Sequence, residues 1–150
     1  MGDSIANLSR AASAISKFAD VLKKSKVYQT KPWGYLEQDD FLNAVILAQT
    51  CLNPYELLNA CKKIESEFGR DFSQFRNAPR PIDIDIIFYE DIQISTPELT
   101  IPHVQWQSRD FVKTPLLDIA MSPDFKNAFG EMITQQILLN EKSYNPFAEF

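Results

Sequence analysis

The sequence predicts one mixed domain of the α/β or α+β class. Segments whose apolar residues recur at helical spacing alternate along the chain with short segments rich in β-branched residues. The chain has 150 residues, the length of one ordinary domain, and no repeat or change in composition divides it. Hydrophobic residues make up 45% and charged residues 23%, which excludes a disordered or collagen-like chain. We therefore expect a single domain over residues 1–150.

The first third of the chain is predicted to form a helix followed by two strands. Apolar residues at helical spacing predict a helix from Asp3 to about Lys24. The segment Ser25–Thr30 is typical of a short strand, and residues 41–50 are typical of a longer one. Residues 31–40 are polar and contain a proline and a glycine, so we expect a loop there.

A second helix is predicted from clear start and stop residues. Asn53 suits the N-cap, Pro54 suits the first helical position, and Glu56 stands where a capping-box carboxylate belongs. An apolar face then continues to Gly69, where we expect the helix to end.

After this helix, residues 70–81 carry two prolines and no periodicity, which indicates a loop. The segment Ile82–Tyr89 (IDIDIIFY) predicts a strand, closed by a tight turn at Glu90-Asp91. The remaining predicted elements are short strands at Ile92–Ser95 and Leu99–Ile101, a turn of helix with packing residues at Arg109–Ile119, a helix at Glu131–Asn140 and a loose tail.

Composition narrows the class of function. No apolar run approaches the roughly 20 residues of a membrane span, and the first residues do not resemble a signal peptide. With 15 basic and 20 acidic side chains, the net charge of −5 argues against binding nucleic acid through its phosphates. Cys51 and Cys61 lack the spacing of a zinc site, so we interpret both as small buried residues in a reducing cytoplasm.

The strongest chemical pattern is the pair Asp83 and Asp85. Residues two apart on a strand face the same way, with Cα atoms about 6.6 Å apart. The opposite, apolar face is formed by Ile82, Ile84, Ile86 and Phe88. Two carboxylates side by side repel each other unless a cation lies between them, and Mg²⁺ is commonly held by one or two carboxylates plus substrate phosphates. The alternative is an exposed acidic face of an edge strand.

Arginines accompany the aspartates. Four of the five arginines of the chain fall between positions 70 and 109, namely Arg70, Arg76, Arg80 and Arg109. Because arginine makes bidentate contacts with phosphate oxygens, this cluster beside a carboxylate-bound metal predicts phosphoryl-type transfer. The alternative is a solvated loop whose arginines pair with surface acids.

Further polar and aromatic residues complete the candidate site. His103, the only histidine, follows Pro102 at a strand end and could donate a hydrogen bond to a phosphate, although a lone histidine is more often structural. A flat heteroaromatic substrate would need stacking rings and an amide that both donates and accepts. The candidates for that role are Trp33, Tyr35, Phe41, Asn43 and Phe111, of which Phe41 and Phe111 could equally be core residues.

These residues occur within a series of motifs. In order they are Y-x-T-x-P-x-G, F-L-N-A, L-L-x-x-x-x-x-I-E-x-x-x-G-R, R-x-x-P-R-x-I-D-I-D-I-I and I-P-H-x-x-x-x-x-R-x-F-V-x-x-P-L-x-D-I-A. This series resembles the 6-hydroxymethyl-7,8-dihydropterin pyrophosphokinases of folate biosynthesis, from about Gly2 to Pro123. The last two motifs, in the correct order and spacing, are highly specific.

The resemblance implies a function and a fold. It implies a cytoplasmic 2-amino-4-hydroxy-6-hydroxymethyldihydropteridine diphosphokinase, a transferase that moves pyrophosphate from ATP to the pterin hydroxymethyl group and releases AMP. It also implies a ferredoxin-like α+β sandwich with an antiparallel-rich sheet and helices packed on it. Other folate-pathway enzymes are candidate partners, whereas nucleic acid and membranes are not expected to be.

The resemblance also implies residue roles. Two Mg²⁺ ions are expected on Asp83 and Asp85, and Arg70 and Arg80 are expected to engage the ATP phosphates and to assist transfer. The other nucleotide-binding positions are Glu65, Ile86, Thr100, His103 and Arg109. The pterin-binding positions are Thr30, Pro32, Trp33, Gly34, Phe41, Asn43 and Phe111.

Three departures from the family pattern stand out. Asn77-Ala78 replaces the usual Trp-Gly, and Phe72 stands where some members carry a basic residue. The family's first apolar strand, which ends in G-S-N, has no counterpart before Gly2-Asp3, so we expect Met1 to be internal to a longer natural chain. These departures keep open a catalytically degenerate relative that binds ATP or pterin without turnover. A nucleic-acid-binding sandwich of similar topology is a second alternative, which the net charge opposes.

Overall fold

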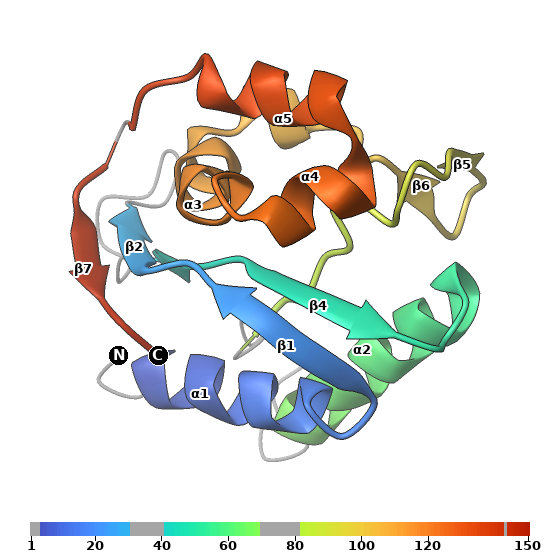
Figure 1. The fold of residues 1–150 in the computed structure, drawn as a ribbon. Helices are drawn as coiled ribbons and strands as arrows, with labels where there is room; N and C mark the ends of the chain where they lie inside the picture. The colour runs from blue at the N-terminus through green and yellow to red at the C-terminus, as the bar shows by residue number, and fades with distance from the viewer. Residues whose placement is uncertain (1–3, 31–40, 70–81, 143) are drawn as a thin grey trace.

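The computed structural model describes residues 4–30, 41–69, 82–142 and 144–150. Figure 1 shows α1 and α2 on one side of the central strands β1 and β4, and α3, α4 and α5 on the other. The elements in chain order are α1 (Ser4–Ile15), β1 (Ala19–Lys24), β2 (Val27–Thr30), β3 (Phe41–Asn43), β4 (Ile46–Thr50), α2 (Pro54–Gly69), β5 (Ile94–Ser95), β6 (Thr100–Ile101), the 3-10 helix η2 (Trp106–Ser108), α3 (Asp110–Ala120), α4 (Pro123–Phe129), α5 (Glu131–Leu138) and β7 (Pro146–Ala148).

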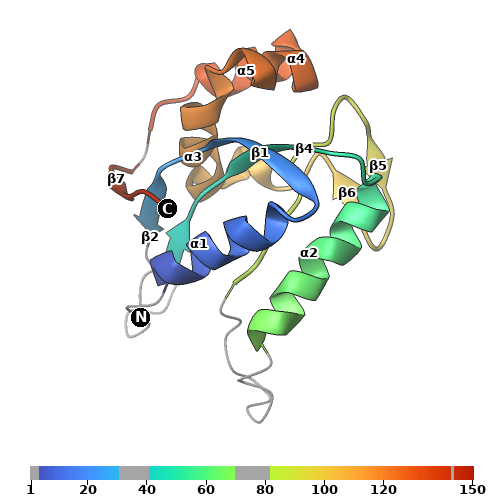
Figure 2. The same ribbon diagram turned by 60° about the horizontal axis from the view of Figure 1, so that its bottom comes forward.

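The strands of the described residues form three small antiparallel sheets. β1 pairs with β4, β5 pairs with β6, and β2 lies between β3 and β7. Figure 2 shows the molecule with α1 and α2 in front, and β7 lies beside β2 at the left of the view. The predicted mixed α+β class is therefore confirmed, with the strands divided among several sheets.

The predicted helix over Asp3–Lys24 is too long. α1 ends at Ile15, and Ala19–Lys24 form β1 instead. The Thr50 hydroxyl donates a hydrogen bond to the carbonyl of Phe18 (2.7 Å) just before the strand begins. Antiparallel pairing with β4 therefore decides the conformation of these six residues, against their helical apolar spacing.

The predicted strand over residues 41–50 is broken in two. β3 pairs with β2, whereas β4 pairs with β1, so the chain changes sheets between Asn43 and Ile46. At the break, the backbone N–H of Val45 donates to the Ser25 hydroxyl, and the N–H of Ser25 donates to the carbonyl of Val45, both at 2.9 Å. The predicted strand at Ser25–Thr30 is confirmed over its last four residues, Val27–Thr30.

The start of α2 forms the capping box that its sequence predicts. The Asn53 side-chain oxygen accepts the backbone N–H of Glu56, and the Glu56 carboxylate accepts the backbone N–H of Asn53, both at 2.9 Å. Two N–H groups that would lack helical partners are thus satisfied, and α2 runs to Gly69 as expected.

We expect Asn53→Ala to destabilise the protein by about 1 kcal/mol, because it removes the cap that fixes the start of α2. Urea unfolding followed by circular dichroism measures this. Asn59→Ala is the matched control, since Asn59 is an exposed residue within the same helix and alanine is the better helix former. Equal losses in the two variants would mean that the cap contributes nothing.

The C-terminal part is more ordered than the sequence predicts. α3 is a complete helix of 11 residues and includes Pro115. α4 was not predicted at all, whereas α5 confirms the helix expected at Glu131–Asn140. The predicted loose tail is wrong, because β7 pairs with β2. The turn expected at Glu90-Asp91 is confirmed. The strands expected at Ile92–Ser95 and Leu99–Ile101 are confirmed in shorter form, as β5 (Ile94–Ser95) and β6 (Thr100–Ile101), which pair with each other.

Two apolar clusters form the core of the part of the chain that the structure describes. The first lies between β4 and the C-terminal helices and contains Leu47, Trp106, Val112, Leu116, Ile119, Ala120, Phe125 and Ile137. The second lies between α1 and α2 and contains Ala11, Ile64, Phe68 and Ile82. None of the helices in the described residues is long and apolar enough to cross a membrane.

Candidate active site

The segment Ile82–Tyr89 connects the two core clusters. Ile82 and Ile84 pack in the second cluster, and Ile87 and Phe88 pack in the first. Asp83 and Asp85 alternate with the two buried or half-buried isoleucines and are both exposed. The two carboxylates therefore project to solvent from a backbone that the core holds on both sides.

This segment is not the hydrogen-bonded strand that the sequence predicts. Its backbone is held by other groups: the N–H of Ile84 donates to the Glu65 carboxylate (2.9 Å), and the carbonyl of Ile87 accepts the N–H of His103 (2.8 Å). The predicted alternation fails at Ile86, because the neighbouring Ile87 packs in the core instead. Hydrogen bonds to Glu65 of α2 and to His103 thus take the place of pairing with a neighbouring strand.

Glu65, a predicted nucleotide-binding residue, lies beside the aspartates. Its Oε2 accepts the Ile84 N–H, so α2 fixes the backbone between Asp83 and Asp85. One helical turn earlier, Cys61 is buried, and burial raises the pKa of its thiol to about 11, with further contributions from the charges of Glu65 and Asp85. The carboxylates of Glu65 and Asp85 therefore both lie near Cys61 on this side of α2.

The two cysteines differ, and only one fits its prediction: Cys61 is buried, but Cys51 is exposed. We expect one thiol per native chain to react rapidly with a disulfide reagent at pH 8, and a second only after unfolding, because the Cys61 thiolate is scarce and inaccessible. Counting released thiolate by absorbance measures this. Cys51→Ser should remove the rapid phase, and a persisting rapid phase would contradict the burial of Cys61.

His103 follows β6 and the cis peptide bond Ile101–Pro102. Its Nδ1 accepts the backbone N–H of Gln105 (3.1 Å), which leaves Nε2 as the ring nitrogen available to donate a hydrogen bond. His103 is half-buried, and its backbone N–H donates a hydrogen bond to the carbonyl of Ile87. Ile87 belongs to the segment Ile82–Tyr89, which we call the aspartate segment. An Nε2–H group fixed in this way is a donor suited to an anionic oxygen.

Arg109 precedes α3 and is connected to His103 through Gln105; we call these three residues the histidine corner. Its guanidinium donates to the side-chain oxygen of Gln105, and its Cζ lies 5.5 Å from the centre of the Phe111 ring. Phe111 packs at the edge of the first core cluster. The structure thus brings three predicted residues, His103, Arg109 and Phe111, into one connected group.

Gln105 is the residue of this group that the sequence did not reveal. Its backbone binds His103 and its side chain binds Arg109. The pattern that could have found it is its position two residues after the histidine and four before the arginine. It is exposed, so its place in this network had no pattern of burial to indicate it.

The predicted pterin-side residues include Asn43, which is half-buried in β3 and stands opposite Tyr28 in the ladder. Thr30 and Phe41 are paired at the other end of the same ladder. The predicted nucleotide-side residues Thr100 and Ile86 are, respectively, exposed in β6 and half-buried in the aspartate segment. Arg70, Arg80, Pro32, Trp33 and Gly34, together with Phe72 and Asn77-Ala78, lie outside the described residues.

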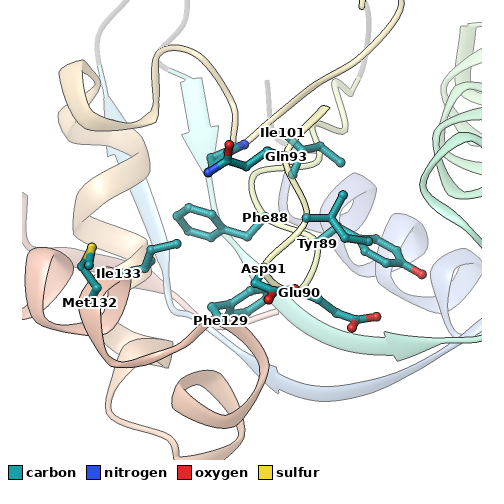
Figure 3. Close-up of a pocket in the computed structure, with 11 residues that line it drawn as sticks. Phe88, Tyr89, Glu90, Asp91, Gln93, Ile101, Phe129, Met132 and Ile133 are labelled. Atoms are coloured by element: carbon teal, nitrogen blue, oxygen red, sulfur yellow. The ribbon is translucent and has the colours of Figure 1, made fainter. Parts of the chain in front are cut away.

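A pocket of about 200 Å³ lies beside the turn at Glu90-Asp91 (Figure 3). Its lining combines residues of the segment Ile82–Tyr89, of the turn and hairpin that follow it, and of the C-terminal helices, among them Phe88, Ile101 and Phe129. Among the described residues of the predicted site, none lines it. The candidate active site is the region around the exposed Asp83 and Asp85 and the connected His103 and Arg109.

Comparison with known proteins gives consistent similarities. A family model for 7,8-dihydro-6-hydroxymethylpterin-pyrophosphokinase matches residues 1–121. The chain is 44% identical over 119 residues to the 2-amino-4-hydroxy-6-hydroxymethyldihydropteridine pyrophosphokinase of Aquifex aeolicus, covering 79% of this chain and 74% of that one. The enzyme of the same name from Methylorubrum extorquens is 41% identical over 122 residues, covering 80% of this chain and 77% of that one.

Longer proteins are similar as well. The folic acid synthesis protein FOL1 of Dictyostelium discoideum is 39% identical over 140 residues, which are 93% of this chain and 21% of that protein. The chain therefore spans about a fifth of the length of this longer relative.

Proposed function

Because this chain belongs to the 7,8-dihydro-6-hydroxymethylpterin-pyrophosphokinase family, we propose that Asp83, Asp85, His103 and Arg109 form the phosphate-binding part of its active site. The predicted enzyme class is confirmed: the chain transfers pyrophosphate from ATP to a hydroxymethyl pterin in folate synthesis. The ferredoxin-like arrangement remains the fold that family membership supports.

The observation that carries the proposal is the exposure of Asp83 and Asp85 together on a fixed backbone. Glu65 binds the N–H between them, and the Ile87 carbonyl joins the same segment to His103. Two anionic groups and two donors for anions therefore lie on directly connected parts of the chain. Such an arrangement suits the binding of a metal together with the phosphates that it neutralises.

The donor set fits Mg²⁺. Both candidate ligands are carboxylates, and within the described residues no group of three potential ligands is present, so substrate oxygens would complete the coordination. When bound, the metal supplies positive charge that polarises the phosphoryl group under attack. Asp83 and Asp85 would hold it, and Glu65 would keep their backbone in place.

The reaction needs charge neutralisation more than covalent chemistry. The pterin hydroxyl oxygen attacks the β-phosphorus of ATP and loses its proton to solvent, a new C–O–P linkage forms, and the bond from the β-phosphorus to the bridging oxygen breaks, so that AMP leaves with that oxygen. His103 Nε2–H would donate to a phosphate oxygen, and the Arg109 guanidinium would neutralise another. Arg70 and Arg80 are proposed to engage the same phosphates, as the family resemblance implies.

The pterin would lie against Asn43 and Phe111. An amide can donate to and accept from the edge of the ring, and a phenyl ring can stack on its face. Thr30, Phe41 and the residues Pro32, Trp33 and Gly34 are proposed to complete this side. The longer folate-synthesis relatives support other folate-pathway enzymes as partners.

AMP release tests the proposal. The purified chain with ATP and Mg²⁺ should release AMP only when 6-hydroxymethyl-7,8-dihydropterin is added, and chelation of Mg²⁺ should abolish the release. Pterin-independent hydrolysis would contradict the proposed acceptor. Binding of ATP and pterin without AMP release would instead favour the degenerate relative.

A further inference from the structure

Asp118, near the end of α3, binds three groups from distant parts of the chain. Its Oδ2 accepts hydrogen bonds from the Tyr28 hydroxyl (2.6 Å) and the Lys26 backbone N–H (3.0 Å). Its Oδ1 lies 2.7 Å from the ammonium nitrogen of Lys142. Tyr28 is fully buried, and the Asp118 side chain is only 12% exposed. Tyr28 and Asp118 are therefore enclosed, and Lys142 completes the network from an exposed position.

The charges of this network are well defined. Burial and the hydrogen bond to Asp118 raise the pKa of Tyr28. Burial opposes ionisation of Asp118, but hydrogen bonds from Lys142, Tyr28 and the Lys26 backbone outweigh it and lower the pKa of this carboxyl. The hydrogen bond to Asp118 raises the pKa of Lys142. A neutral phenol, a carboxylate and an ammonium group thus persist around neutral pH.

The network connects the two elements that carry the proposed pterin contacts. Tyr28 and Asn43 are directly opposite in the β2–β3 ladder, so their side chains lie on the same face of the sheet. Phe111 lies on α3, seven residues and thus two turns before Asp118, or about 10 Å along the helix axis. The bond between Tyr28 and Asp118 therefore fixes the position of Asn43 relative to Phe111.

The counter-ion comes from the C-terminal segment. Lys142 precedes β7, which pairs with Val27 and Tyr28 of β2. Figure 1 shows this segment passing from α5 along the outer edge of β2. A second ion pair joins Lys26 and Glu149 at 3.7 Å. This segment lies outside residues 1–121, which the family model matches.

We propose that Asp118 is a positioning residue for pterin binding, and that Lys142 and β7 hold it and β2 in place. The proposal rests on the proposed function, because it takes Asn43 and Phe111 as the pterin contacts. Neither Asp118 nor Lys142 needs to touch substrate. A merely structural network would affect pterin and nucleotide binding alike, whereas a positioning role affects pterin binding selectively.

The test compares four variants with the wild-type chain. Tyr28→Phe removes only the hydroxyl, Lys142→Met removes the counter-ion, and Lys142→Arg restores the charge. Lys126→Met is the control, since Lys126 forms an exposed ion pair with Glu131 at 3.7 Å. Calorimetry measures the Kd of 6-hydroxymethylpterin in the presence of Mg²⁺ and a non-hydrolysable ATP analogue, and the Kd of the analogue alone.

We expect Tyr28→Phe and Lys142→Met to raise the pterin Kd about tenfold, with the analogue Kd changed less than about twofold. Lys142→Arg should recover most of the affinity, and Lys126→Met should equal the wild type. An unchanged pterin Kd in Tyr28→Phe, or equal losses for both ligands, would overturn the proposal. Tyr28→Phe keeps the buried ring and removes only the hydroxyl. This variant therefore tests the positioning role even if Lys142→Met does not fold.

Failure of the proposed function gives a different result. A wild-type chain that binds pterin but releases no AMP contradicts the enzymatic proposal, while the selective loss in the variants can still be measured. A wild-type chain that does not bind pterin overturns both proposals. AMP release by the wild type, with unchanged pterin Kd in Tyr28→Phe and Lys142→Met, overturns only the positioning role.

Discussion

Asp83→Asn and Asp85→Asn are each expected to lower AMP release by about a thousandfold or more. Loss of a metal-binding carboxylate removes several kcal/mol of transition-state stabilisation, and about 4 kcal/mol corresponds to a thousandfold in rate. Asparagine keeps the size of the side chain but removes the negative charge. Turnover at saturating ATP, pterin and Mg²⁺ measures the effect, followed by a Mg²⁺ titration in which any residual activity should need more metal.

The same variants should remain folded. Both aspartates are exposed and alternate with buried isoleucines, so their substitution leaves the packing of the segment intact. Asp91→Asn is the matched control, because Asp91 is an exposed aspartate in the turn directly after the same segment and is no proposed site residue. Full activity in Asp83→Asn or Asp85→Asn would refute the metal assignment, and an equal loss in Asp91→Asn would indicate a general effect of charge.

The sequence predicts best those elements whose ends depend on neighbouring residues. α2 begins at the capping box of Asn53 and Glu56 because the two residues satisfy each other's backbone groups locally. β1 was predicted as helix, because its apolar spacing fits a helix and only its pairing with β4 makes it a strand. Local patterns of six residues do not contain that information.

In the candidate site, too, the sequence predicts what depends on neighbouring residues and misses what depends on distant ones. The alternating pattern correctly predicts that Asp83 and Asp85 are exposed while Ile82 is buried. The sequence could not show that Ile82–Tyr89 lacks strand pairing, because the hydrogen-bond partners of this segment are distant. They are Glu65, 19 residues away from Ile84, and His103. The Tyr28–Asp118 hydrogen bond spans 90 residues, and no periodicity connects such positions.

Phe125→Ala should cause the largest loss of stability, about 4 kcal/mol. Phe125 is fully buried on α4, the helix that the sequence did not predict. Its ring centre lies 4.7 Å from that of Phe129 and 6.2 Å from that of Phe88. Alanine would remove these aromatic contacts and leave a cavity beside the segment that carries the aspartates. Urea unfolding followed by tryptophan fluorescence measures the loss, since Trp106 contacts Phe88 at 5.1 Å.

Phe147→Ala provides a matched control, because Phe147 is 51% exposed and its truncation opens no enclosed cavity. We expect it to lose no more than about 1 kcal/mol. Phe125→Leu, which keeps more of the apolar volume, should fall between the two. Since Phe125 lies beyond residues 1–121, a large loss would mean that the part of the chain outside the family match contributes to the first core cluster, which holds Ile87 and Phe88 at the end of the segment that carries the aspartates. Equal small losses at positions 125 and 147 would instead mean that α4 packs too loosely to support that segment.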